Sequence, residues 1–427
     1  MQKNDICEGL VAGLGTDGEG IINIDGVTAF VPFCLEGERV AFKILKVNGG
    51  VAYGKIEKIT VPSETRVAPP CPVFYKCGGC DIQHMNYASQ LAFKRESVKR
   101  ALLKIGGIGV EAEQTVPCDR QYGYRNKLVL PIGVDGEGRT IVGFYARRSH
   151  RIVPSDNCLI QAEWAKKVYS AVLDFAAVTG VSGYDEQKGK GVLRRIAVRE
   201  VAGKFVFALV VTRNIDVSYL ITELEKHFKD FTFLLNVNTD KTNGIFGKEW
   251  HICRGDGFIE AESNGILYSA GANTFLQVND GVRDKLYARV LSEVDADCTA
   301  VDLYSGGGML TAMLAKKCSK VYGIEIVAEA SECADELKER NGLCGKMVNI
   351  CGAAENEIDG VLKTVKGKSV IVCDPPRKGM ERSVVRAIAA SGADKVILVS
   401  CNPATLARDL GLLTGTLVED GGKLVKT

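Results

Sequence analysis

The last third of the chain repeats one rhythm, in which a short apolar strand, a turn and a helical stretch follow one another. We expect strands at Ala300–Tyr304, Val321–Glu325, Val370–Asp374 and Val396–Ser400. Alternation of this kind builds a doubly wound, mostly parallel sheet, because each strand reaches its parallel neighbour through a crossover helix. Such sheets bind ligands beyond the carboxyl ends of their strands. The sequence therefore predicts an α/β domain over residues 271–427.

Two further domains are expected before it, since 427 residues suffice for about three domains. Residues 1–62 contain short runs of alternating apolar and polar positions, such as Gly20–Ile24, Thr28–Val31 and Glu38–Phe42, separated by glycines. This pattern is typical of a small, OB-like β-barrel. Residues 63–270 mix strand and helix patterns, which favours an α+β central domain.

The charges of the chain are distributed unevenly. The 54 basic and 52 acidic residues nearly balance, so a polyanionic partner must be held by a local patch. Residues 84–151 carry 12 basic and 6 acidic side chains, and a basic amphipathic helix is expected at Tyr87–Leu103. We therefore place the basic surface in the middle of the chain.

The sequence shows no targeting or membrane signal. No apolar run reaches the roughly 18 residues of a membrane span, and the first residues lack the apolar core of a secretion signal. We therefore predict a cytoplasmic protein without a membrane partner. Nothing in the sequence suggests more than a monomer.

A glycine-rich turn follows the first strand of the α/β domain, in Asp302–Gly308. Gly306 and Gly308 would let the backbone approach a ligand closely, and Glu325 stands 23 residues after Asp302. That spacing is typical of a carboxylate that binds ribose hydroxyls. The third glycine of the dinucleotide pattern is missing, which favours S-adenosylmethionine over a nicotinamide cofactor. A purely structural turn is the alternative.

A second motif, Asp374-Pro375-Pro376-Arg377, ends the third expected strand. The prolines would hold the loop in one shape, so that Asp374 is presented to a cofactor or a planar base. The alternative is a turn stiffened by proline. Enzymes that methylate amines use a similar loop, so the motif does not identify the reaction.

Cys401 follows the fourth expected strand. Asn402 is a favourable N-cap and Pro403 a favourable first helical residue, which places the thiol at a helix N-terminus. Unpaired amides and the positive end of the helix dipole favour the thiolate there and make a nucleophile. Most cysteines are inert core residues, and only the place of Cys401 beside the other two motifs favours catalysis.

Such a nucleophile fits the methylation of a pyrimidine carbon. Carbon 5 of uracil is too weak a nucleophile to accept a methyl group directly, and a thiolate that adds to carbon 6 turns it into an enolate. A base then removes the proton on carbon 5, and elimination frees the cysteine. The methylation of amines has no use for this cysteine.

Four of the fifteen cysteines have the spacing of a metal site: Cys71, Cys77, Cys80 and Cys158. Three ligands close together and one distant partner suit a [4Fe–4S] cluster. Zinc is the alternative, but its sites usually take ligands in two close pairs. Unrelated thiols are a third interpretation.

Together these motifs resemble the RNA uridine-5-methyltransferase family along nearly the whole chain, and in particular its iron–sulfur branch, which methylates 23S ribosomal RNA. The resemblance implies a Rossmann-like methyltransferase domain preceded by an RNA-binding TRAM barrel and a central domain with the [4Fe–4S] cluster. It implies that Cys401 is the nucleophile. The cofactor contacts that it implies are Gln277 (in the segment Phe275–Asn279), Tyr304, Gly306, Gly308, Glu325 and Asp374, and the cluster ligands are Cys71, Cys77, Cys80 and Cys158.

The sequence departs from the family pattern at three places. Ser305 stands where a cysteine is common, and Ala353 where an acid is often found. The family also has a C-terminal Phe-Pro…His-x-Glu segment, whose glutamate is the base, whereas this sequence ends at Thr427. From this ending we expect an enzyme that attacks uracil but turns over poorly.

Other functions stay open at this point. A transfer RNA could be the substrate instead of 23S ribosomal RNA. A binding module would keep the grip on RNA without catalysis, and an electron-transfer protein would use the cluster as a redox centre.

Overall fold

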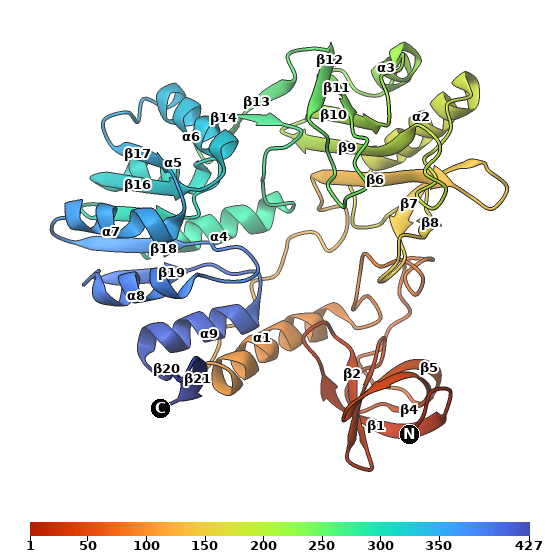
Figure 1. The fold of residues 1–427 in the computed structure, drawn as a ribbon, viewed down its shortest axis with the longest axis horizontal. Helices are drawn as coiled ribbons and strands as arrows, with labels where there is room; N and C mark the ends of the chain where they lie inside the picture. The colour runs from red at the N-terminus through yellow and green to blue at the C-terminus, as the bar shows by residue number, and fades with distance from the viewer. The chain divides into compact units, whose positions relative to one another are not determined.

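The computed structural model describes residues 1–427 and divides into two compact units (Figure 1). The first unit comprises Met1–Ser97, Glu113–Val116 and Ile141–Cys158. The second comprises Val98–Ala112, Pro117–Thr140 and Leu159–Thr427. The division into three domains at residues 62 and 270 stays a prediction.

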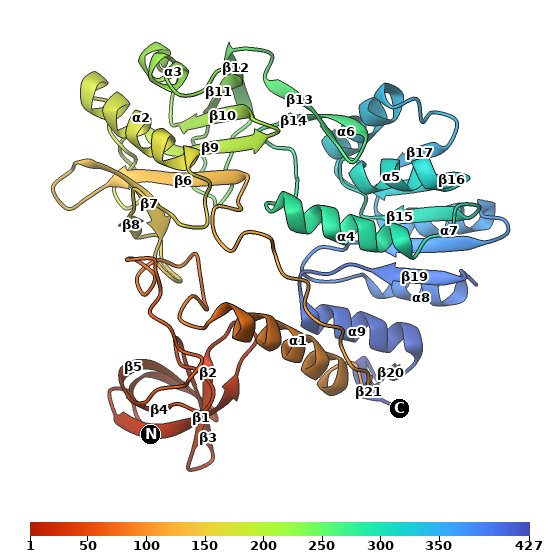
Figure 2. The same cartoon turned by 180° about the vertical axis from the view of Figure 1, so that it is seen from behind.

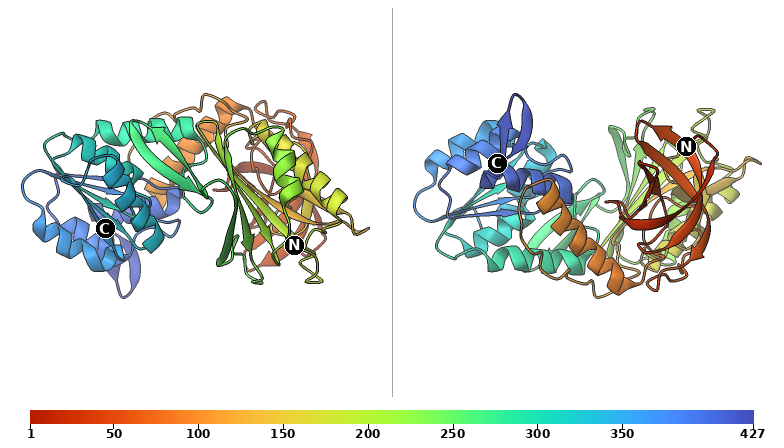
Figure 3. Two further views of the ribbon diagram at one scale, coloured as in Figure 1. Left: turned by 90° about the horizontal axis from the view of Figure 1, so that it is seen from above. Right: turned by 90° about the horizontal axis from the view of Figure 1, so that it is seen from below.

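The first unit begins with a closed five-stranded barrel, whose strands are drawn in red in Figure 3. This confirms the small β-barrel. Its strands follow the order β1-β2-β3-β5-β4, and β3 and β5 are parallel. Their bounds are β1 (Ile6–Leu14), β2 (Gly20–Ile24), β3 (Val27–Val31), β4 (Arg39–Asn48) and β5 (Val51–Val61).

The barrel core explains why its strands alternate. Val40, Phe42 and Ile44 are fully buried at every second position of β4, while Arg39 is exposed. Gly54 on β5 faces this core, and a Cβ there would lie 2.7 Å from the ring of Phe42. A glycine therefore lets the two strands pack closely.

Two further elements involve the first unit. The helix α1 (Tyr87–Lys104) confirms the expected basic helix, and its residues belong to both units. Of its side chains only Leu102 is buried. A hairpin of β7 (Thr140–Tyr145) and β8 (Ile152–Pro154) follows later in the chain.

The second unit contains a sheet with the strand order β12-β11-β10-β9-β6. In it β10 and β11 are parallel and the other pairs are antiparallel. Nearby elements are two helices and the hairpin β13–β14. The bounds are β6 (Lys127–Val134), β9 (Leu193–Val201), β10 (Lys204–Val211), β11 (Phe231–Val237), β12 (Glu249–Arg254), β13 (Phe258–Ser263), β14 (Ile266–Gly271), α2 (Trp164–Thr179) and α3 (Ser218–Glu225).

The rest of the second unit is the doubly wound domain, which confirms the predicted α/β fold. Its five strands are all parallel, in the order β17-β16-β15-β18-β19. Four of them were predicted, and β17 was not. The bounds are β15 (Thr299–Leu303), β16 (Lys320–Glu325), β17 (Met347–Cys351), β18 (Ser369–Cys373), β19 (Lys395–Leu398), α4 (Asp280–Ser292), α5 (Met309–Lys317), α6 (Ala328–Arg340), α7 (Ala354–Thr364), α8 (Arg382–Ala390), α9 (Pro403–Thr414), β20 (Leu417–Asp420) and β21 (Lys423–Lys426).

Helices cover both faces of this parallel sheet, as Figures 1 and 2 show. Alternate residues of β18 point to opposite faces: Val370 and Val372 pack with α4, α5 and α6, whereas Ile371 and Cys373 pack with α7 and α8. Since both faces are covered by helices, the strand ends are the accessible part of the sheet.

None of the helices combines the length and the apolar composition that crossing a bilayer requires.

Candidate active site

Four neighbouring strands bring the predicted motifs to one edge of the parallel sheet. The glycine turn follows β15, Glu325 ends β16, Asp374 follows β18, and Cys401 comes three residues after the end of β19. Because the strands are parallel and adjacent, their carboxyl ends meet at the same edge. The predicted residues at this edge are Tyr304, Gly306, Gly308, Glu325, Asp374 and Cys401.

The glycine turn is held by the carboxylate of Glu325. The amide of Gly306 donates to Glu325 Oε2 at 2.9 Å, and the amide of Val327 donates to Oε1 at 2.8 Å. Gly308 has φ +81°, and a Cβ there would lie 2.7 Å from the Cβ of Ala334 on α6. The sequence therefore needs glycine at 308 both for its backbone conformation and for close helix packing.

Tyr304 lies in the left-handed region, with φ +65°. Backbone strain of this kind is found mainly at functional sites, where the surrounding structure enforces it. Its hydroxyl is buried without a hydrogen-bond partner, and burial raises the pKa of that hydroxyl. An orphaned polar atom beside a glycine turn fits a site that binds a polar ligand.

Three carboxyl groups interact at this edge. Asp302 is buried and accepts a hydrogen bond from Thr311 Oγ1 on α5 at 2.6 Å. Its pKa is raised to about 7, mainly by burial and also by the charges of Asp374 and Glu325, while the hydrogen bond from Thr311 opposes the shift. Burial also raises the pKa of Asp374. Such acceptors suit a ligand with hydroxyl or ammonium donors, as S-adenosylmethionine has.

Sequence reasoning used Asp302 only to count the distance to Glu325, and did not assign it to the site. The sequence could have pointed to Asp302, because it is a carboxylate within an otherwise apolar strand. Such a strand is buried on both faces of a covered sheet, so its carboxylate is buried as well.

The surroundings of Cys401 confirm the expected start of a helix. Asn402 caps α9, since its Oδ1 accepts from the amide of Ala404 at 2.9 Å, and Pro403 is the first helical residue. The amide of Asn402 donates to Ser400 Oγ at 3.1 Å. Cys401 itself is exposed. An accessible thiol at a capped helix N-terminus has the environment of a nucleophile.

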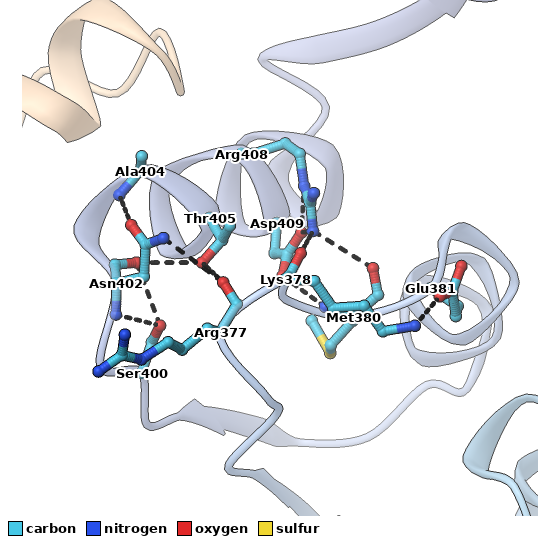
Figure 4. A network of polar contacts seen from close by, with 10 residues as sticks. All are labelled: Arg377, Lys378, Met380, Glu381, Ser400, Asn402, Ala404, Thr405, Arg408 and Asp409. Carbon is cyan, nitrogen blue, oxygen red and sulfur yellow. Dashed lines mark hydrogen bonds and ion pairs between the residues drawn. The ribbon is translucent and has the colours of Figure 1, made fainter. Parts of the chain in front are cut away.

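The loop that follows Asp374 is tied to α9 by a network of polar contacts, shown in Figure 4. The loop contributes backbone groups of Arg377, Lys378 and Met380, and the helix contributes the side chains of Arg408 and Asp409. The motif at the end of β18 and the helix after Cys401 are thus linked directly.

Gln277 is held by other partners. Its carbonyl accepts from Asn126 Nδ2 at 3.0 Å, and the amide of Asn126 donates to the carbonyl of Val278 at 3.0 Å. Asn279 caps α4, while Phe275 is 74% exposed. No hydrogen bond joins Gln277 to the glycine turn, and its role at the cofactor stays a prediction.

The four predicted cluster ligands lie in the first unit, close enough to influence each other. The pKa of Cys80 is raised to about 11, mainly by burial and also by the charges of Cys158, Cys77 and Cys71, while a hydrogen bond with Gln83 opposes the shift. The donor set thus fits a four-thiolate site. However, no three His, Cys, Asp or Glu side chains are arranged to hold a metal ion. The metal site that the spacing predicts is therefore not formed in this structure.

Comparison with known proteins identifies the family. The tRNA (Uracil-5-)-methyltransferase family model matches residues 200–419. An uncharacterized RNA methyltransferase of Clostridium tetani is 40% identical over 97% of this chain and 91% of its own. A second, from Halalkalibacterium halodurans, is 37% identical over 99% of this chain and 92% of its own.

A solved structure agrees with these relatives. The crystal structure of Pyrococcus abyssi tRNA (uracil-54, C5)-methyltransferase in complex with S-adenosyl-L-homocysteine superposes with a TM-score of 0.76 and 27% identity. It covers 94% of this chain and 92% of its own. The chain therefore belongs to the tRNA (uracil-5-)-methyltransferase family and is an S-adenosylmethionine-dependent RNA methyltransferase.

Proposed function

We propose that the chain methylates carbon 5 of a uridine in RNA through a transient bond between Cys401 and the base. One observation carries the proposal: an exposed thiol at the capped start of α9 shares a sheet edge with a glycine turn and three carboxyl groups. A nucleophile and a polar cofactor site are the two components that this reaction needs.

S-adenosylmethionine, when bound, supplies an electrophilic methyl group. Tyr304, Gly306, Gly308, Glu325 and Asp374 would hold it, because they combine open backbone with carboxylate acceptors. The role of Gln277 at the cofactor and the base is part of this proposal.

Cys401 carries the covalent step. Its thiolate adds to carbon 6 of the uracil, and the electron pair of the ring then makes carbon 5 nucleophilic. After carbon 5 has received the methyl group, a base takes the proton from it, and the electrons expel the sulfur of Cys401. The thiolate is regenerated, and the products are methylated RNA and S-adenosylhomocysteine.

Replacing the nucleophile tests this proposal. We expect Cys401→Ala to abolish both methylation of uridine and the covalent RNA–protein complex, because alanine cannot add to carbon 6. Mass spectrometry of RNA nucleosides and denaturing gels measure the two. Cys344→Ala is the matched control, since Cys344 is equally exposed and lies between α6 and β17. Methylation by Cys401→Ala would contradict the proposal, and RNA binding alone would support a binding module.

The substrate that we propose is 23S ribosomal RNA, with the N-terminal barrel acting as an RNA-binding TRAM domain. The closed barrel and the basic segment at residues 84–151 support an extended grip on RNA. A transfer RNA is the second candidate, favoured by the similar structure of the Pyrococcus abyssi enzyme. Incubation with each RNA separately, followed by mapping of the methylated position, decides between them.

We also propose that Cys71, Cys77, Cys80 and Cys158 hold a [4Fe–4S] cluster. Their mutual effect on the pKa of Cys80 supports this ligand set. Because no three of these side chains are arranged to hold a metal ion in the structure, assembly of the cluster should rearrange them. When bound, the cluster would cross-link Cys71–Cys80 to Cys158.

Metal analysis tests the cluster. Protein purified without oxygen should contain about four irons and absorb visible light, and Cys80→Ser should lose both. Cys253→Ser, which changes an exposed cysteine of the second unit, should retain them. One zinc ion and no iron would contradict the cluster, and reversible reduction required for activity would favour the electron-transfer alternative.

A further inference from the structure

Two consecutive residues of α9 grip the loop that follows Asp374 (Figure 4). Asp409 is only 2% exposed, and its Oδ2 accepts from the amide of Met380 at 2.9 Å. Its Oδ1 accepts from Arg408 Nε at 2.7 Å. Arg408 Nη2 in turn donates to the carbonyls of Lys378 at 3.0 Å and Met380 at 3.3 Å. The loop is thus held through its backbone on both sides of Gly379.

Gly379 shows how closely the loop and the helix approach. Its φ is +78°, and a Cβ at this position would come within 2.5 Å of Asp409 Oδ2 and closer still to Arg408 Nη2. Any larger residue would therefore be strained and would also displace the side chains that form the grip. The glycine and the ion pair act as one unit, which we call the loop clamp (Gly379, Arg408 and Asp409).

The loop clamp lies between the two motifs that the reaction requires. The loop starts at Asp374, and α9 starts two residues after Cys401. Two longer contacts of 3.4 Å join the loop to the start of α9, next to Cys401. In both, the carbonyl of Arg377 is the acceptor, and Asn402 Nδ2 and Thr405 Oγ1 are the donors. A displacement of the loop would therefore be transmitted to the helix that carries Cys401.

The chemistry of the clamp points to positioning rather than to stability alone. The ion pair contributes little net stability compared with apolar packing, because the buried Asp409 carboxylate loses its hydration while the Arg408 side chain stays 31% exposed. It does impose one geometry, since a carboxylate that accepts from two donors and a guanidinium that donates to three acceptors fit in a single arrangement.

We infer that Asp409, acting through Arg408 and Gly379, is a positioning residue that fixes the Asp374 loop relative to Cys401. This inference rests on the proposed function of Cys401 and deepens it. The clamp contacts neither reacting atom, and its effect is to keep the nucleophile at the distance that methyl transfer requires. Misplacement of reacting groups by about 1 Å can reduce a rate about a hundredfold.

The test compares Asp409→Asn, Gly379→Ala and the double variant with the wild type. An asparagine offers one oxygen to two donors, and an alanine at 379 collides with the clamp. Glu419→Gln is the matched control, because it makes the same change of carboxylate to amide in the pair with Arg382 and Arg386 of α8, outside the loop clamp.

We expect each single variant to lower kcat about tenfold or more while KM for RNA changes less than about threefold, and the control to behave as the wild type. The double variant should be no slower than the slower single variant, since both changes break the same clamp. Unchanged kcat, or effects that multiply in the double variant, would overturn the inference.

A second measurement separates this inference from the proposed function. The rate at which iodoacetamide alkylates Cys401, followed by peptide mass spectrometry, reports the position of the thiol without any methyl transfer. If the wild type does not methylate uridine, the proposed function fails. The positioning role then stands if both single variants change the alkylation rate by a similar factor and the double variant changes it no further. It is overturned if the alkylation rate is the same in all variants.

Discussion

Asp302 places a carboxyl group in the covered part of the parallel sheet, against Thr311 of α5. Its pKa is near 3.8 in the unfolded chain and about 7 in the folded one, mainly because of burial. Between these pH values the folded chain binds more protons than the unfolded chain. The free energy of unfolding therefore falls as the pH rises through this window.

We expect Asp302→Asn to be more stable than the wild type at pH 8, by at most about 4 kcal/mol, and the difference to vanish near pH 4. Asparagine keeps an acceptor for Thr311 and carries no charge. Urea unfolding at both pH values measures the effect. Asp297→Asn, which changes an exposed carboxylate five residues earlier, should show no such dependence. A loss of stability at pH 8 would disprove the account.

For single residues, the sequence could predict a role only where that role depends on adjacent residues of the chain. Cys401 was assigned correctly to a helix start, because Asn402 and Pro403 are cap residues in any context. Asp409 could not be found in this way. A carboxylate in a helix usually faces water, and only the fold brings the amide of Met380, 29 residues away, to it.

Among the secondary structure elements, the barrel depends on one buried ion pair. Glu38 follows the turn before β4 and is fully buried. It accepts from Arg66 Nε at 2.5 Å and Nη2 at 2.8 Å, and from the amides of Leu35 and Ser63. Burial opposes the charge, but the hydrogen bonds from Arg66 and these amides lower the pKa of the carboxyl overall.

Removing one partner should therefore destabilise the barrel. We expect Arg66→Met to cost about 3–5 kcal/mol at neutral pH, because Glu38 is left buried and unpaired. The cost should decrease as the pH falls through the folded pKa of Glu38, where the carboxylate takes up a proton. Arg139→Met breaks a surface pair with Asp135 and should cost far less, because both charges stay hydrated. Equal costs in chemical denaturation would refute this prediction.

The central strands of the parallel sheet could be predicted from sequence, and β17 shows why an edge strand could not. The central strands of the parallel sheet are buried on both faces and give apolar runs such as Ser369–Cys373. β17 lies at the edge of the sheet, where only Met347 is buried and the polar Asn349 is tolerated. An edge strand thus lacks the apolar run that identifies a buried one. The thiol arrangement was similarly out of reach, since spacing alone does not fix side-chain positions.

Across the whole molecule basic and acidic residues nearly balance, but the helix α1 is strongly basic. α1 carries five basic residues and one acidic residue, and only one of its side chains is buried. Its exposed lysines, such as Lys94 and Lys104, are therefore available for phosphate groups of RNA.

We expect the double variant Lys94→Ala/Lys104→Ala to bind RNA more weakly at low salt. The slope of log affinity against log salt should become shallower by about 1.4, or about 0.7 for each lost phosphate contact. Titrations at several salt concentrations measure the slope. Lys363→Ala/Lys366→Ala, which removes two exposed lysines at the end of α7, should leave it unchanged. The same slope for both double variants would argue against α1 as an RNA contact.

One apolar core of the second unit continues from the antiparallel strands into the parallel sheet. Val206 and Ala208 of β10, Ile266 and Tyr268 of β14, and Ala300 of β15 all belong to it. Neither sheet can open without exposing side chains that the other one covers. Heating should accordingly unfold both sheets in a single cooperative transition. The temperature at which the site at the carboxyl edge of the parallel sheet unfolds therefore depends on strands far from it in the sequence.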